Sequence, residues 1–127
     1  MSHEVLVVED DEAIALLIHT LLTRNGIAID MAPDGRTAIE RLAAKRYSAV
    51  VLDLMIPGVS GFDVIDYVKA NAITTPIAVV SAVSQRRMPD LDRSVVKAIV
   101  AKPFDVDKFV ETVRELCATS PQSSAPA

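Results

Sequence analysis

The chain has 127 residues, of which half are apolar, and a formal net charge of −4 at pH 7. This length predicts one domain with a core large enough to fold without disulfides or a structural metal. No apolar run approaches the roughly 20 residues that span a bilayer, and residues 1–4 lack the basic start of a signal peptide. We therefore expect a cytoplasmic protein without a membrane partner, and its acidic balance disfavours direct binding to nucleic acid.

Five short apolar runs alternate with segments of helical periodicity. The predicted strands cover residues 5–8, 27–31, 48–52, 77–81 and 98–101. The predicted buried helix positions are Ile14, Leu17, Ile18, Leu21, Leu22, Ala38, Ile39, Leu42, Phe62, Ile65, Val68, Val106, Phe109, Val110, Val113 and Leu116. This alternation predicts an α/β protein with a parallel sheet. Continuous apolar strands also predict a sheet that is buried on both faces.

The segment 84–97, where a fourth helix belongs, departs from this pattern. It contains Pro89 within a polar run, and proline inside a helix costs about 3 kcal/mol. Either the helix begins at or after Pro89, or the segment is partly irregular, so we predict an atypical fourth helix and a mobile region. We assign residues 1–118 to the domain and residues 119–127, which are rich in Ser, Pro and Ala, to a disordered tail.

Charged residues follow three of the predicted strands. Glu9 and Asp10 follow the first, Asp53 follows the third, and Lys102 follows the fifth. The carboxyl ends of parallel strands meet at one sheet edge, where α/β proteins bind ligands. Carboxylates are ligands for Mg²⁺, and a carboxylate that accepts a phosphoryl group needs a cation and a lysine to offset the added charge. Ser81 ends the fourth strand and offers a hydrogen-bond donor to phosphate.

Four short motifs in this order carry a resemblance to a known family. They are residues 7–10, residues 51–58 together with Gly61-Phe62, residues 81–82, and residues 102–104. The chain resembles, from about residue 4 to residue 116, the receiver domains of two-component response regulators, in particular stand-alone receivers of the chemotaxis type. The resemblance implies a flavodoxin-like, doubly wound sheet with the strand order 2-1-3-4-5.

The resemblance also implies a role for each site residue. Asp53 would take a phosphoryl group from a histidine kinase or a histidine phosphotransfer protein. The implied Mg²⁺ ligands are Asp10, Asp53, the carbonyl of Met55 and, through water, Glu9. The implied phosphate contacts are Lys102, Ser81 and the amide of Ala82. A cis peptide bond between Lys102 and Pro103 is a further expectation, since the family turns the chain there.

Two departures from the family, at Ile99 and in the irregular segment 84–97, leave alternatives open. Receivers commonly have Tyr or Phe three residues before the lysine, whereas this chain has Ile99. A phosphorylation-dependent signalling switch is favoured, which acts on a downstream protein target and catalyses only its own phosphotransfer and dephosphorylation. The alternative is a receiver-like interaction module that works without phosphorylation. A hydrolase of the haloacid dehalogenase kind would normally have a second Asp where this chain has Met55.

No segment after Leu116 is predicted to form an output domain. The chain is therefore expected either to act by binding partners or to be a fragment of a longer protein. The single cysteine, Cys117, has no partner for a disulfide or a metal-ligand spacing. We expect it to pack as a small apolar side chain.

Overall fold

The computed structural model describes residues 3–56, 58–81, 91–102 and 104–119. Five strands form one parallel sheet in the order β2-β1-β3-β4-β5. The strands are β1 (His3–Val8), β2 (Ile27–Ala32), β3 (Ala49–Asp53), β4 (Ile77–Ser81) and β5 (Val96–Ala101). This architecture confirms the predicted flavodoxin-like α/β fold.

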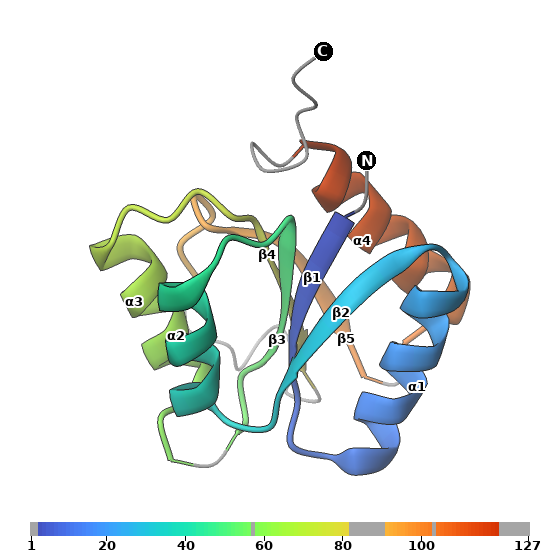
Figure 1. Cartoon of the computed structure of the whole chain (residues 1–127), viewed down its shortest axis with the longest axis horizontal. Coiled ribbons are helices and arrows are strands. Elements are labelled where there is room, and N and C mark those ends of the chain that lie inside the picture. Colours follow the sequence, from blue (N-terminus) through green and yellow to red (C-terminus); the bar gives the residue numbers. More distant parts are fainter. Residues whose placement is uncertain (1–2, 57, 82–90, 103, 120–127) are drawn as a thin grey trace.

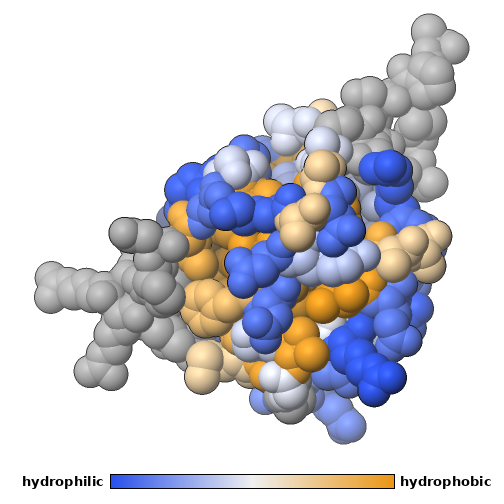
Figure 2. All heavy atoms as spheres, turned by 90° about the vertical axis from the view of Figure 1, so that its left-hand side faces the viewer, coloured by the Kyte–Doolittle hydropathy of each residue, from blue (hydrophilic) through white to orange (hydrophobic). Residues whose placement is uncertain are grey.

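Helices cover both faces of the sheet (Figure 1). On one face lie α1 (Glu12–Arg24) and α4 (Val106–Thr119), and on the other lie α2 (Gly35–Ala44) and α3 (Gly61–Ala70). Each pair of helices encloses its own apolar cluster against the sheet. Seen from the side of α2 and α3, hydrophilic side chains cover much of the surface and apolar residues show between them (Figure 2). An apolar cluster forms on each face of the sheet because each helix turns one apolar stripe toward the strands.

Burial differs between the central and the edge strands. All five residues of β3 and of β4 are buried, as are the last four residues of β1. The edge strands β2 and β5 contain exposed and half-buried residues. The expectation of full burial on both faces is therefore correct for the centre of the sheet and wrong for its edges, where a strand has a neighbour on one side only.

Nine of the sixteen predicted helix positions are buried and two are exposed, while five are half-buried, namely Ile14, Leu21, Ile39, Phe62 and Val110. Leu17 and Val106 are exposed, and Phe62 is half-buried while Val64 is fully buried in its place. Leu17 lies at the margin of the α1 stripe and Val106 is the first residue of α4. Residues at the margin or the end of an apolar stripe satisfy the helical periodicity although the sheet does not cover them.

The chain that enters β5 is irregular where the structure describes it. Residues 91 and 92 lack regular structure, residues 93–95 form a turn, and the described residues 91–97 contain no helix. Asp92 is paired with Lys69 of α3 at 2.8 Å, which ties this turn to the neighbouring helix. The strand begins at Val96, two residues earlier than predicted, because Val96 pairs with Ile77 and an irregularity at Lys97 restores the register.

Several sequence-based predictions lie outside the described residues. They concern residues 84–90 of the atypical segment, the peptide bond to Pro103, and residues 120–127 of the predicted tail. Thr119, which we assigned to the tail, is the last residue of α4. None of the helices in the described part of the chain is long and apolar enough to cross a membrane.

Candidate functional site

Three carboxylates meet at the carboxyl ends of β1 and β3. Glu9 and Asp10 directly follow β1, and Asp53 is the last residue of β3. One oxygen from each of the three residues lies within 4.8 Å of the others, and Glu9 and Asp53 are buried while Asp10 is exposed. The pairing of β1 with β3, with Val8 opposite Leu52, brings these acids together. The predicted acidic cluster therefore forms.

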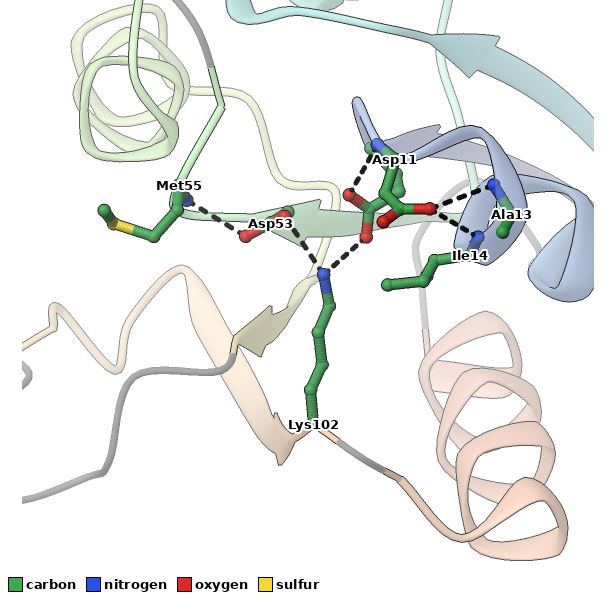
Figure 3. A network of polar contacts seen from close by, with 7 residues as sticks. Asp11, Ala13, Ile14, Asp53, Met55 and Lys102 are labelled. Atoms are coloured by element: carbon green, nitrogen blue, oxygen red, sulfur yellow. Dashed lines mark hydrogen bonds and ion pairs between the residues drawn. The ribbon is translucent and has the colours of Figure 1, made fainter.

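Lys102 reaches into this cluster from the end of β5. Its Nζ lies 2.6 Å from Oε1 of Glu9 and 3.1 Å from Oδ2 of Asp53. Figure 3 shows the lysine side chain extending from its strand toward Asp53 at the end of β3. The backbone amide of Lys102 donates a hydrogen bond to the carbonyl of Ser81 at 2.9 Å. The lysine is thus fixed at both its backbone and its ammonium group.

Backbone amides hold the remaining carboxylate oxygens (Figure 3). The amide of Met55 donates to Oδ1 of Asp53 at 2.9 Å, and the amide of Asp11 donates to Oε2 of Glu9 at 3.2 Å. Asp11 in turn caps α1 by accepting hydrogen bonds from the amides of Ala13 and Ile14. Each buried carboxylate therefore has one amide and the shared lysine as partners, which satisfies the requirement that a buried charge be paired.

The local environment shifts the ionisation of Glu9 and Lys102. Burial raises the pKa of Glu9 above its usual value, Lys102 opposes this rise, and the neighbouring Asp53 adds to it. Partial burial on its own lowers the pKa of Lys102, but the hydrogen bonds to Glu9 and Asp53 outweigh burial and the net shift is upward. The lysine is therefore held as a cation, and the ionised form of Glu9 is disfavoured by its burial.

Gly61 belongs to one of the sequence motifs, and the structure shows that it allows close packing beside Asp53. It opens α3, and a Cβ atom there would lie 2.6 Å from the Cα of Leu54 and 2.7 Å from the backbone oxygen of Asp53. The amide of Gly61 also donates to the carbonyl of Leu54 at 3.2 Å. The helix can therefore pack directly against the end of β3 only because this residue is glycine. Ser60 and Asp63 form a capping box at the same helix start.

The other predicted site residues differ in how the structure places them. Ser81 is fully buried at the end of β4. This strand is the direct neighbour of β3, which ends at Asp53. The side chain of Met55 is exposed and points away from Asp53 (Figure 3). Ala82 lies outside the described residues. Ile99 is half-buried and packs against the apolar cluster on the α2 and α3 side.

The donor set fits a magnesium ion. Three carboxylates and one ammonium group carry a formal net charge of −2 in a small volume. One of the three carboxylates, that of Asp10, faces solvent. Oxygen donors from one or two carboxylates, completed by water, are the usual protein ligands of Mg²⁺. Glu9, Asp10 and Asp53 are therefore the residues that could hold this metal.

The family model of the response regulator receiver domain matches residues 5–114. Among curated proteins, the response regulator ArlR of Staphylococcus saprophyticus is 29% identical over 123 residues, which cover 95% of this chain and 55% of ArlR. The transcriptional regulatory protein DltR of Streptococcus agalactiae is 35% identical over 111 residues, which cover 86% of this chain and 49% of DltR. The chain spans about half the length of the curated relatives it matches.

Solved structures show the same relationship. The receiver domain of the Francisella response regulator 1452 superposes with a TM-score of 0.85 and 30% identity, covering 91% of this chain and 97% of that one. TrrA of Thermotoga maritima, solved in complex with Mg(2+)-BeF, gives a TM-score of 0.80 with 31% identity, covering 90% of this chain and 98% of that one. On its sequence match and its fold, the chain belongs to the family of response regulator receiver domains.

Proposed function

We propose that this domain is a phosphorylation-dependent signalling switch in which Asp53 accepts a phosphoryl group with the help of Mg²⁺. The observation that carries the proposal is the placement of Lys102 between the two buried carboxylates, with Asp10 completing the acidic cluster. A nucleophile, a cation and a set of metal donors are thereby combined at one edge of the sheet. The complex of the relative TrrA with Mg(2+)-BeF supports the same combination.

The chemistry is a transfer between two protein side chains. One carboxylate oxygen of Asp53 attacks the phosphorus of a phosphohistidine, a new O–P bond forms, and the P–N bond breaks with its electron pair returning to the imidazole. The amide of Met55 orients the carboxylate through its bond to Oδ1. Lys102 offsets negative charge on the transferred group. Mg²⁺ bound by Asp10 and Asp53, by the carbonyl of Met55 and, through water, by Glu9 would supply the further positive charge that such a transfer needs.

The donor and the output of the switch are proteins. The donor in this proposal is a histidine kinase or a histidine phosphotransfer protein, because a phosphohistidine supplies the group that Asp53 takes. Ser81 and the amide of Ala82 would contact the phosphoryl oxygens, and a downstream protein would read the change. The domain has no other substrate in this proposal and is a regulatory phosphoacceptor rather than an enzyme.

Labelling with a small phosphodonor tests the site. The protein is incubated with acetyl phosphate and Mg²⁺, and intact mass spectrometry is expected to show one labile phosphate that disappears in Asp53→Asn. Asp66→Asn serves as the matched control, since Asp66 is an exposed aspartate on α3. Labelling that survives Asp53→Asn would reject Asp53 as the acceptor.

Ile99 favours a second candidate, a protein-interaction module that works without phosphate. Its aliphatic side chain packs against the apolar cluster. Because isoleucine has no hydroxyl, it cannot move a polar group between solvent and core as a tyrosine could. This candidate predicts that neither phosphate nor beryllium fluoride is incorporated at Asp53 while partner binding persists. Phosphate on Asp53 in the labelling experiment rejects it.

A further inference from the structure

A groove of about 500 Å³ lies between the end of α1 and the part of α4 from Val106 to Arg114. The two helices lie on the same face of the sheet (Figure 1). The apolar lining of the groove consists of Leu21, Val106 and Val110, of which Val106 is 41% exposed and the other two are half-buried. Neither the acidic cluster nor Lys102 contributes to this lining. A contact made by this surface would therefore be separate from the phosphoryl chemistry proposed for Asp53.

Charged residues of both signs line the groove at different levels. Asp107 and Glu111 lie in the first two turns of α4, and Arg114 lies about one turn farther along the helix. Arg24 is the last residue of α1 and precedes Asn25, which is bonded to Arg114, so both arginines lie at the same end of the groove. Within the residues that the structure describes, none of these four charged side chains forms an ion pair. The groove thus has an acidic end and a basic end that are not paired within one molecule.

Arg114 is ordered before any partner binds. Its Nη2 donates to Oδ1 of Asn25 at 2.9 Å, and Nδ2 of Asn25 donates in turn to the carbonyl of Leu21 at 2.7 Å. A guanidinium group has five donor hydrogens in a planar fork, so one bond to an amide leaves donors for a carboxylate. A side chain that is already ordered loses less entropy when a partner binds. An acidic side chain is therefore the partner that suits this end of the groove.

We propose that the groove is the contact surface between two copies of this chain, related by a twofold axis. A twofold contact needs a surface that is complementary to itself. Asp107 and Arg114 are seven residues apart, which is about 10.5 Å along the helix, and their midpoint lies between Val110 and Glu111. When two α4 helices cross antiparallel at this midpoint, Asp107 of each copy faces Arg114 of the other, and the two Val110 side chains meet near the centre.

Charge complementarity favours a second copy as the occupant. One groove supplies both the carboxylates and the guanidinium groups, so each charged end is matched by the opposite end of the second copy. Exposed ion pairs are individually weak. The contact covers a few turns of two helices, which is small beside the roughly 1,600 Å² of a standard interface. We therefore expect a weak dimer that salt dissociates.

Paired charge reversals test the contact. Asp107→Arg places an arginine opposite Arg114, and Arg114→Asp places an aspartate opposite Asp107, so each variant repels its own copy. Each variant alone should dimerise at least about tenfold more weakly than the wild type, because a twofold contact contains every pair twice. An equimolar mixture of the two variants restores both pairs of opposite charge and should associate as the wild type does. Sedimentation velocity at low salt, from micromolar to millimolar concentration, measures the wild type, the variants and the mixture.

The matched control is Lys108→Glu, which reverses an exposed charge on α4 outside the groove and should dimerise as the wild type does. Recovery in the mixture also shows that both variants are folded. A wild type that stays monomeric at millimolar concentration overturns the proposal, even if another protein occupies the groove. A mixture that fails to associate, an equal loss in Lys108→Glu, or a wild-type dimer that is indifferent to added salt overturns it as well. None of these outcomes depends on phosphate labelling of Asp53, because the groove contains no residue of that site.

Discussion

Two regions of this domain have the same arrangement of charges in different surroundings. In each, one lysine bridges two carboxylates from different strands or strand ends. Lys102 contacts Glu9 and Asp53, and its side chain is 13% exposed, whereas Lys45 contacts Glu4 at 2.8 Å and Asp30 at 3.3 Å and is 45% exposed. The second group lies beside Tyr47, whose hydroxyl donates to Asp30 at 2.7 Å.

The clusters around Lys45 and Lys102 contain the same kinds of charged group but differ in burial and in their position in the sheet. Around Lys45 water solvates the charges, so the ion pairs are weak and serve local structure. Around Lys102 the carboxylates are shielded, and the pKa of Glu9 is raised by burial. The same three groups therefore form a solvated ion pair at Lys45 and a shielded charged cluster at Lys102, where strand ends converge.

The largest effect is expected from removing each lysine in turn. Lys102→Met leaves two buried carboxylates without their cation and should lower the free energy of unfolding by about 3 kcal/mol. Lys45→Met removes an exposed bridge and should lower it much less. Urea unfolding without divalent cations measures both values. Equal losses for the two variants would contradict the contrast between the regions.

A smaller effect is expected from the close packing that supports the buried region. Gly61→Ala places a Cβ atom against the backbone of Leu54 and Asp53 and should cost about 2 kcal/mol through overpacking. Gly26→Ala is the control, because Gly26 has a positive φ of 77° but no atom within 4 Å of a Cβ. It should cost about 1 kcal/mol from backbone strain alone and leave phosphorylation of Asp53 unchanged. Normal labelling in Gly61→Ala would show that the helix start does not position the acceptor.

The smallest effect is a difference in pH dependence. Burial raises the pKa of Glu9, so the stability linked to its protonated form is fully present below about pH 4.3, its unfolded pKa, and is lost as pH rises through the folded value. The Tyr47 hydroxyl, aided by Lys45, lowers the pKa of Asp30, so its contribution is present above about pH 3.9 and is lost as pH falls through the folded value.

These opposite signs can be measured in two variants. Without divalent cations, Glu9→Gln should flatten the change in unfolding free energy between pH 7 and about pH 4, close to the unfolded pKa of glutamate. Asp30→Asn should flatten only the decline at lower pH. Chemical denaturation over this range measures how the free energy of unfolding of each variant depends on pH. If the pH dependence between pH 7 and about pH 4 is unaltered in Glu9→Gln, Glu9 is not its source.

Sequence reasoning predicted the sheet and the acids but not the distances between them. The strand order was implied by the resemblance to receiver domains. The meeting of Glu9, Asp10 and Asp53 was expected because parallel strands place their carboxyl ends together. The preference of Lys102 for Glu9 could not be predicted, since it depends on how far two side chains reach from the ends of β5 and β1, past β4 and β3. The close approach at Gly61 likewise depends on the packing of α3 against β3 and not on local pattern.

The errors in the helices have a common physical origin. Leu17 and Val106 fit the periodicity of their helices and are nevertheless exposed. Periodicity gives the direction of a side chain around its helix, whereas burial also depends on whether a neighbouring element reaches that position. The entry to β5 shows the same limit, because the register of Val96 is set by its partner strand.

The central place of β3 determines which parts of the domain can respond to a modification. The strand is hydrogen-bonded to β1 and β4, and every one of its residues is buried. We therefore expect the backbone of β3 to open only with global unfolding, and its amide hydrogens to be among the slowest to exchange. If Asp53 accepts a phosphoryl group as proposed, the group is added at a strand end held on both sides, and we expect its effect to reach the surface through neighbouring side chains.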